Sequence, residues 1–552
     1  QEAIDHYRQA LGLLKEQKKY ERAARTLMKL GLAHHNAFEF GPARRAYEQG
    51  FALWQRAGKT GPEVSPPPAP HTLRVFWLNL PTLDPTLTSL GSTPAVMSQL
   101  FRGLVESGPA LEVVPDLAKN WEVLEGGRKY VFHLRDDARW SDGTPVTADD
   151  FEYAWRRALD PATESPQASM LYDVAGARGF HQGQAGWEDV GVRAPDKLTL
   201  VVELEGPTGY FLQLLADQVT YALPQHAVEA HGESWTEVGN IVTNGPFKLQ
   251  AWQPGQSMVL VRNPLYSGRF TGNVQRVELT LLRLQEWPDV LEMYEADELD
   301  VLPRLWHVPP QERDRIRRRH AGEYVSVPAL HTGYVGFDVG RPPFDDLRVR
   351  QAFALAIDKE TLAGVVNRGY WSPATGGFLP PGMPGHSPGI GLPYDPEGAR
   401  QRLAEAGYPG GRGFQTVNAR TFHGIEASVE YLQAQWRDVL GVEIACEAVQ
   451  FDEAEDEWGG EEPPHVSIEA WKASYPDPSD LLPPGMESAC KGWQCKAFDR
   501  LVNEARRTMD QGERMRLYQQ ADRILVEQAP VIPWCHLRWS LLIKPWVRRY
   551  PA

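Results

Sequence analysis

The sequence predicts a mixed α/β protein of more than one domain, preceded by a short all-helical segment. Its 552 residues are too many for one ordinary hydrophobic core. From residue 73 onward, short strand-like apolar runs alternate with amphipathic helices, which is the pattern of an α/β protein with large lobes. Before residue 58, the apolar residues recur only at helical spacing.

The first segment, residues 1–57, is predicted to consist of helices. Its apolar pattern recurs at an offset of about 40 residues, as in Tyr7 and Tyr47. The runs 30–34 and 43–54 resemble the two helices of a tetratricopeptide repeat. Such repeats stack on one another, so this segment would be the tail of a longer array that offers a surface to a protein partner or acts as a spacer. The alternative is a plain helical hairpin packed on the next domain.

A linker is predicted at residues 58–71, because prolines at 62, 66, 67, 68 and 70 favour an extended, semi-rigid chain. Strands are expected in the α/β part that follows, and two helices stand out by their amphipathic spacing. The expected strands are 73–78, 130–134, 198–202, 258–261 and 277–282, and the expected helices are 148–159 and 349–357.

Composition excludes several classes of function. The chain is 42% hydrophobic and 23% charged, as folded proteins are. Its formal charge of −15 argues against nucleic-acid binding, which needs a basic face. No apolar run approaches the roughly 18 residues of a membrane span. No secretion signal follows Gln1, which fits either a removed signal or a longer protein. The basic cluster of Arg313, Arg315, Arg317, Arg318 and Arg319 is interpreted as a solvated helix face.

The chain has four cysteines, too few for a disulfide scaffold. Cys490 and Cys495 are close enough in sequence to bridge, and the sequence leaves open whether they do. Cys446 and Cys535 lie in strand-like runs, where buried free thiols are the ordinary expectation. Neither CxxC spacing nor a paired histidine accompanies them, so no metal site and no cofactor is predicted.

Catalytic motifs are also missing from the sequence. It contains no P-loop, no Gly-x-Ser-x-Gly elbow, no His-Glu-x-x-His helix and no Gly-x-Gly-x-x-Gly run after a strand. The paired acids Asp149 and Asp150 stand at an expected helix start, where acids suit the helix dipole. We therefore expect a protein that is not an enzyme.

Residues 130–155 carry the most informative pattern. The run Tyr130-Val-Phe-His-Leu-Arg135 precedes Asp136-Asp-Ala-Arg-Trp-Ser-Asp-Gly-Thr-Pro-Val-Thr147, and then Ala148-Asp-Asp-Phe151 and Trp155. It predicts a strand, a Gly-Thr-Pro turn and a helix with Thr147 as its N-cap. This run closely resembles the signature of family 5 extracellular solute-binding proteins, the receptors of oligopeptide and dipeptide ABC transporters. Collinear matches follow the family's order at 83–85, 240–247, 263–264, 298–300, 342–358, 380–384, 403–408, 471–478 and 544–546.

The resemblance implies a two-lobed periplasmic-binding-protein type II fold with an extra subdomain in the first lobe. The first lobe would span residues 72–276, with the subdomain at about 113–195. The second lobe would span 277–522, and 523–552 would return to the first lobe. The lobes would close on a ligand, and a peptide ligand would be held as an added extended strand.

The resemblance also implies the ligand-contacting positions. These are Ser89, Gly91, Arg304, Gly336, Phe451, Ala470, Trp471, Lys472 and Ser474. Peptide receptors of the family carry an Asp where this chain has Ser474, and that Asp pairs with the ligand's α-ammonium. Loss of this charge-assisted hydrogen bond predicts an affinity for free amino termini weaker by about one to two decades. The nearby Asp477 is not expected to replace it.

Further positions depart from the family. Its Arg-His pair appears here as Trp458-Gly459, a further Arg as Ile468, and a pocket Trp as Phe451. The family's cross-linked cysteines correspond to His331 and Lys472, so that bridge is missing. Two interpretations fit these departures. The cleft binds something other than a peptide with charged termini, or it has drifted and serves as a scaffold.

The predicted function is non-catalytic binding of peptides or peptide-like solutes, as the substrate-binding component of an ABC transporter. Such a component would be extracytoplasmic and would dock on a membrane permease. The alternative is a ligand-sensing or scaffold domain of a larger cytoplasmic regulator, coupled through the N-terminal repeats.

Overall fold

The computed structural model divides the chain into two compact units, one of residues 1–70 with 544–552 and one of residues 71–543. The described residues are 7–12, 14, 23, 26–27, 30, 42, 45–46, 49, 71–88, 94–108, 111–270, 272–282, 287–303, 305, 308, 310–449, 464–483, 486, 489–548 and 550.

In the first unit, the described positions between 7 and 49 are helical. Leu27, Leu30 and Ala46 are buried together, with Tyr7 and Leu11 packed against them. These positions do not show a tetratricopeptide repeat, which stays a prediction. The predicted linker lies outside the described residues apart from His71, and so do most of the quoted repeat positions.

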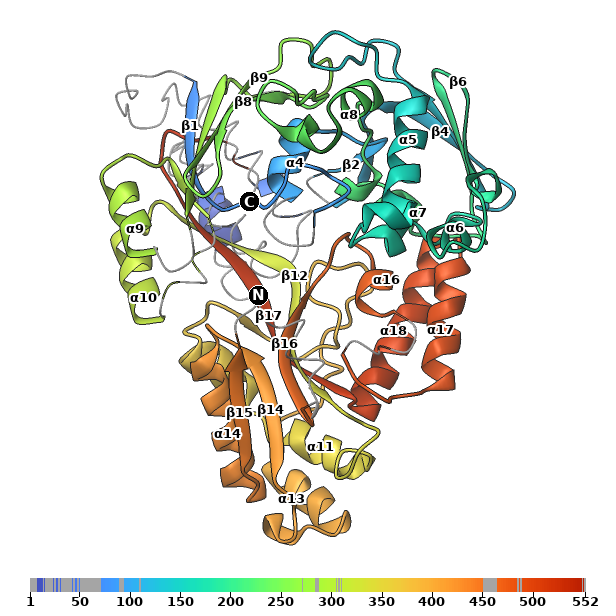
Figure 1. Cartoon of the computed structure of the whole chain (residues 1–552). Coiled ribbons are helices and arrows are strands. Elements are labelled where there is room, and N and C mark those ends of the chain that lie inside the picture. Colours follow the sequence, from blue (N-terminus) through green and yellow to red (C-terminus); the bar gives the residue numbers. More distant parts are fainter. Residues whose placement is uncertain are drawn as a thin grey trace. The chain divides into compact units, whose positions relative to one another are not determined.

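The second unit is built on one sheet, which has eleven strands among the described residues (Figure 1). Its strand order is β15-β14-β16-β12-β17-β11-β1-β10-β9-β8, with β13 paired to β17. The strands are β1 (Thr72–Leu78), β8 (Phe247–Gln253), β9 (Ser257–Arg262), β10 (Arg276–Leu282), β11 (Val301–Leu302), β12 (Tyr324–Phe337), β13 (Ser372–Pro373), β14 (Val417–Phe422), β15 (Ile444–Val449), β16 (Val466–Lys472) and β17 (Val531–Ile543).

The long antiparallel pair of β12 and β17 supports a core on each of its faces. Alternate side chains of a strand point to opposite faces, so Val335 and Phe337 enter one core while Tyr334 enters the other. The first core is closed by α11 (Leu347–Leu355), α13 (Pro396–Glu405) and α14 (Glu426–Leu440). The second is closed by α16 (Pro478–Leu481), α17 (Lys496–Arg507) and α18 (Gln511–Gln528).

A separate sheet in the order β4-β5-β7-β6 lies beside α5 (Ala148–Leu159) in Figure 1. Its strands are β4 (Ala118–Leu124), β5 (Lys129–Leu134), β6 (Val192–Asp196) and β7 (Thr199–Glu203). Tyr130, Phe132 and Leu134 alternate inward along β5. Helix α5 begins after Thr147, whose backbone N–H donates to Asp150 Oδ2 at 2.8 Å. The predicted strand, turn and N-capped helix are confirmed.

The other predicted strands are also present, as β1, β7, β9 and β10, and α11 corresponds to the predicted helix 349–357. The remaining strands and α-helices among the described residues are β2 (Val105–Ser107), β3 (Val113–Pro115), α4 (Pro94–Leu100), α6 (Ala177–His181), α7 (Phe211–Leu214), α8 (Gln225–His231), α9 (Trp287–Glu295), α10 (Pro310–Arg319) and α12 (Lys359–Thr361).

The interpretation of the basic cluster on α10 was wrong at one position. Arg315, Arg317, Arg318 and Arg319 are exposed, but Arg313 is only 3% exposed. Its guanidinium lies 4.9 Å from the centroid of the Tyr370 ring, so the aromatic face takes the place of water around it.

Candidate functional site

Strand β16 has one edge that is only partly covered. On one side it pairs with β12 over its whole length, from Val466 opposite Phe337 to Lys472 opposite His331. On the other side, β14 pairs only with Val466, Ser467 and Ile468. Among the described residues, no strand pairs with residues 469–472 on that side, and Ala470 is exposed. The backbone groups there form an open sheet edge, which an extended chain can join.

A carboxyl group lies against the turn that follows this edge. Asp480 Oδ2 accepts a hydrogen bond of 2.7 Å from the backbone N–H of Ser474. Burial raises the pKa of Asp480 to about 7, the bond from Ser474 opposes this rise, and the nearby Asp217 adds to it. An ammonium group brought to this place would ionise Asp480 and pair with it.

Asp217 is a second buried carboxyl group in the same neighbourhood. It is 7% exposed, and its Oδ1 accepts a hydrogen bond of 3.1 Å from the Val219 N–H. Burial raises its pKa to about 6, and Lys472 acts in the opposite direction. Burial also lowers the pKa of His331 to about 4, with a contribution from Lys472. Segments that are far apart in sequence therefore bring acidic and basic groups to the end of β16.

Asp477, which the sequence did not favour as a replacement anchor, has a structural role. It is 1% exposed and forms an ion pair with Arg514, which is fully buried. Its Oδ1 also accepts hydrogen bonds from the backbone N–H and hydroxyl of Ser479, at 2.9 and 2.8 Å, at the start of α16. Through these contacts Asp477 connects α16 with α18, so its carboxylate is already paired within the protein.

The ring of Tyr475, next to Ser474, contacts residues from distant segments of the chain. The Tyr475 ring stacks on that of Tyr210, with centroids 6.0 Å apart and planes at 9°. Arg506 Nε donates to the Tyr210 hydroxyl at 2.9 Å, and Arg506 Nη2 lies 3.2 Å from Asp173 Oδ1. Residues 173 and 210 are thereby joined to α17, and the Tyr210 ring connects them to the 474–480 turn.

The structure gathers four of the nine positions predicted from the family. Ala470, Trp471 and Lys472 form the open edge of β16, and Ser474 follows it. Gly336 is elsewhere, because it pairs with Ser467 in the covered part of β16. The predicted positions Ser89, Gly91, Arg304 and Phe451 lie outside the described residues, as do Trp458 and Gly459.

Two positions aligned with the family's cysteines face each other as the resemblance implied. A third aligned position, Ile468, shows why an arginine is absent there. His331 and Lys472, which replace the family's cross-linked cysteines, stand directly opposite each other across β12 and β16. Ile468 is fully buried in the core that α14 closes. Sequence reasoning missed Asp480 and Asp217. The only sequence signal for Asp480 was that it follows Ser474, the position where the family's anchoring Asp is replaced by a neutral residue.

Gly336 leaves no room for a side chain. A Cβ atom there would lie 2.1 Å from the Ala489 carbonyl oxygen and 2.7 Å from Ser467 Oγ. We expect Gly336→Ala to lower the free energy of unfolding by about 1–3 kcal/mol through overpacking, measured by urea denaturation. Gly364→Ala is the control, because no atom lies within 4 Å of its Cβ position. Equal urea midpoints for both variants would contradict this account of Gly336.

The cysteines are free thiols in this structure, which answers the open question of a bridge between Cys490 and Cys495. Cys490 is buried, and its thiol donates to the Met486 carbonyl oxygen at 3.2 Å. Cys535 is buried as expected, whereas Cys446 is only half-buried.

The described residues contain neither a metal-ligand cluster nor a membrane-spanning helix. No group of three or more His, Cys, Asp or Glu side chains there is placed to hold a metal ion. No helix in the described ranges combines the length and apolar character of a membrane span.

Comparison with known proteins decides the family. The model described as "Bacterial extracellular solute-binding proteins, family 5 Middle" matches residues 112–493. The chain belongs to this family. Family 5 proteins are extracytoplasmic binding proteins, so the open strand edge described above belongs to a binding fold.

Two curated relatives cover most of the chain. The probable deoxycholate-binding periplasmic protein YgiS of Escherichia coli (strain K12) is 33% identical over 484 residues, which are 85% of this chain and 88% of YgiS. The periplasmic oligopeptide-binding protein OppA of the same strain is 30% identical over 489 residues, which are 85% of this chain and 87% of OppA. These relatives are binding proteins, and they give no support to the regulatory alternative.

Solved structures show the same fold. The Escherichia coli murein tripeptide binding protein MppA superposes with a TM-score of 0.74 at 27% identity, covering 87% of this chain and 96% of MppA. Haemophilus influenzae OppA in complex with RPPGFSPFR gives a TM-score of 0.71 at 25% identity, covering 87% of this chain and 96% of that protein. The mixed α/β two-lobed binding-protein fold predicted from the sequence is confirmed for this family 5 protein.

Proposed function

We propose that this family 5 protein is the substrate-binding component of an ABC transporter and binds peptides or peptide-like solutes without catalysis. The observation that carries the proposal is the open edge of β16 at residues 470–472, which ends beside the Asp480 carboxyl group. An extended peptide would pair with the edge through its main chain and place its amino terminus at the acid. Relatives named for oligopeptide binding support this ligand class.

The site would be completed by the remaining predicted positions. Ala470, Trp471 and Lys472 would pair with the ligand main chain, and Ser474 would line the turn. Ser89, Gly91, Arg304 and Phe451 remain proposed contacts from the other segments. We assign Gly336 to packing instead, because Ala489 fills the space in front of it.

The proposal extends to the partners and the organisation of the chain. The protein would work outside the cytoplasm and deliver its ligand to a membrane permease, as transporter receptors do. Residues 72–276 would form the first lobe, 277–522 the second, and 523–552 the return. Residues 1–57 would be a tetratricopeptide-like segment for a protein partner. Deleting them tests this last point, because the helical circular dichroism should fall while peptide affinity stays unchanged.

Asp480 is proposed to take the role that the family gives to an Asp at the position of Ser474. The neutral Ser474 removes one carboxylate, but Asp480 supplies another at the backbone of the same residue. Asp217 lies close enough to strengthen the negative field once both acids ionise. The affinity lost at Ser474 would then be restored in part.

We expect Asp480→Asn to weaken binding of peptides with a free amino terminus about 10- to 100-fold, since a charge-assisted hydrogen bond is lost. Isothermal titration calorimetry with a peptide and its N-acetylated form measures this effect, and the acetylated form should show no such drop. Asp438→Asn is the control, because the Asp438 side chain is 65% exposed on α14. Equal losses for the free and acetylated peptides would contradict the assignment.

The same site predicts a pH dependence. Burial raises the pKa of Asp480 to about 7, so the acid is neutral at pH 5 and ionised at pH 8. A peptide α-ammonium deprotonates at about pH 7.7–8.0. The affinity for peptides should therefore rise from pH 5, reach a maximum between the pKa of Asp480, about 7, and that of the peptide α-ammonium, and fall at higher pH. In Asp480→Asn, the rise on the acidic side should disappear.

The test of the function is a thermal-shift screen against short peptides and against deoxycholate, the ligand for which the relative YgiS is named. Stabilisation by several peptides supports the proposal. Stabilisation by deoxycholate alone would show that a different class of solute occupies the site.

A further inference from the structure

Lys359 is a buried cation with no acidic partner in the described part of the chain. It is 7% exposed, and its Nζ donates one hydrogen bond, of 3.0 Å, to the Ala374 carbonyl oxygen. An ammonium group has three N–H donors. Burial alone accounts for the lowering of its pKa to about 8, and no carboxylate among the described residues raises it. Lys359 is therefore mostly protonated at neutral pH, although none of the residues that the structure describes supplies a counter-charge.

The titratable groups around Lys359 do not supply that counter-charge. The neighbouring Asp358 is turned to its own helix, where it accepts hydrogen bonds from Thr361 N–H and Oγ1 at 3.0 and 2.6 Å. Burial lowers the pKa of His536 to about 3, with contributions from His386 and Lys359, and burial also lowers the pKa of His386. Both imidazoles are neutral at pH 7.

His536 adds an unused polar atom to this region. It is 2% exposed, and its Nδ1 lies 3.1 Å from Thr332 Oγ1. Its Nε2 is buried and has no hydrogen-bond partner among the described residues. The surroundings of Lys359 thus combine an unpaired charge with an unsatisfied imidazole nitrogen, which is uncommon in protein interiors.

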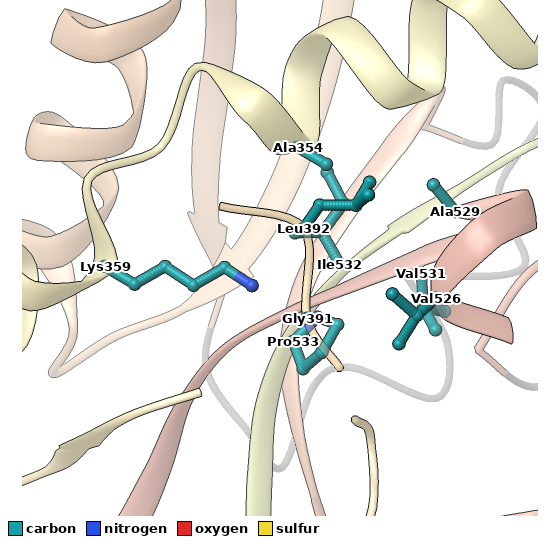
Figure 2. Close-up of a pocket in the computed structure, with 9 residues that line it drawn as sticks. All are labelled: Ala354, Lys359, Gly391, Leu392, Val526, Ala529, Val531, Ile532 and Pro533. Carbon is teal, nitrogen blue, oxygen red and sulfur yellow. The ribbon is translucent and has the colours of Figure 1, made fainter. Parts of the chain in front are cut away.

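A pocket adjoins Lys359, and Figure 2 shows the side chain extending its Nζ toward it. The empty volume is about 230 Å³, part of which is open to solvent. Lys359 is the one charged residue among those lining it. The walls come from α11, the end of α18, β17 and the loop at 391–392, and include Ala354, Leu392, Val526, Ile532 and Pro533.

We propose that this pocket binds a compact monovalent anion, of the size of chloride or acetate, with its negative charge against Lys359 Nζ. Buried charges in proteins are paired, and the anion completes the pair that the described residues do not supply. The cavity volume within reach of a water-sized group is only about 10 Å³, far below the roughly 300–1,000 Å³ of pockets for drug-sized ligands, so the ligand is small. The apolar walls favour one charge and exclude a heavily hydrated dianion such as sulfate.

The experiment uses the full chain with bromide, acetate and gluconate, the last being too large for the pocket. At pH 7 and constant ionic strength, replacing gluconate by bromide or acetate should raise the thermal midpoint by about 1–3 °C if the anion reaches roughly 20 times its dissociation constant. The gain should be lost in Lys359→Met and kept in Lys491→Met, where the lysine is exposed. A gain from acetate without bromide would identify a carboxylate site, and a gain from both a general anion site.

Two measurements on the wild-type protein test the proposal even if Lys359→Met does not fold. In the wild-type protein, the gain should vanish at pH 9.5, where Lys359 is deprotonated. Crystals soaked in bromide should show an anomalous peak beside Lys359 Nζ. Equal gains in Lys359→Met and the wild type would overturn the proposal, as would a gain that persists at pH 9.5. A bromide peak without any shift in solution would mean binding at crystal concentration only, which also overturns it.

Discussion

Arg514→Met is expected to lower the free energy of unfolding by about 3–5 kcal/mol, because it leaves a buried carboxylate without its partner. The side chains of Arg514 and Asp477 are 0% and 2% exposed. Arg514 Nη1 also donates to Gln511 Oε1 at 3.1 Å, and the guanidinium lies 5.5 Å from the centroid of the Tyr518 ring. Urea denaturation followed by circular dichroism measures the loss.

A double variant distinguishes the contribution of the Arg514–Asp477 ion pair from that of the other contacts of these side chains. In Arg514→Met with Asp477→Leu, no charge is left unpaired, so most of the lost stability should return. About 1 kcal/mol should stay missing, because Asp477 also caps α16 through the Ser479 N–H. Arg516→Met is the control on the same helix, with a side chain 68% exposed. A double variant less stable than Arg514→Met would show that the ion pair is not what Arg514 contributes.

Asp84→Ala should lower the free energy of unfolding by about 2–4 kcal/mol, because the hydrogen-bond donors that share the Asp84 carboxylate all lose their acceptor. Asp84 is 2% exposed. Its Oδ1 accepts from the Thr86 N–H at 2.9 Å, and its Oδ2 accepts from Trp235 Nε1 at 3.1 Å and pairs with Arg157 Nη2 at 2.8 Å. The carboxylate thereby joins the 82–88 turn to α5 and to Trp235. The effect is smaller than at Arg514 because the Arg157 side chain is 22% exposed.

The indole N–H signal of Trp235 in an NMR spectrum offers a local readout for Asp84→Ala, since Trp235 is 1% exposed and loses its acceptor. That signal should move in the folded variant. Asp137→Ala is the matched control, because that side chain is 55% exposed and its pair with Arg135 is a surface one. An unchanged urea midpoint for Asp84→Ala would contradict the role given to this motif.

The parts of the fold that follow from local chemistry were predictable from the sequence. The Gly-Thr-Pro turn, the N-cap at Thr147 and the apolar periodicity of α5 specify their conformations within a few residues. The resemblance to the family added the long-range pairing, and the opposition of His331 and Lys472 agrees with it. Collinear motifs carry such information because they imply one topology for the whole unit.

The candidate site was less predictable, because its groups meet only after folding. Asp480 and Asp217 are more than 200 residues apart in sequence, and no local pattern connects them. The packing of Gly336 against Ala489 depends on a loop from another segment, so the family position alone suggested a ligand contact. The prediction that Arg313 is solvated failed for the same reason, since the ring of Tyr370 that covers it comes from a distant turn.

The most direct test of peptide binding is to identify what the purified protein carries. The protein is denatured, and the released small molecules are identified by mass spectrometry. The account predicts a mixture of short peptides with free amino termini, reduced in Asp480→Asn and unchanged in Asp438→Asn. An empty protein that also shows no thermal shift with a peptide library, or one that carries only a non-peptide compound, would contradict it.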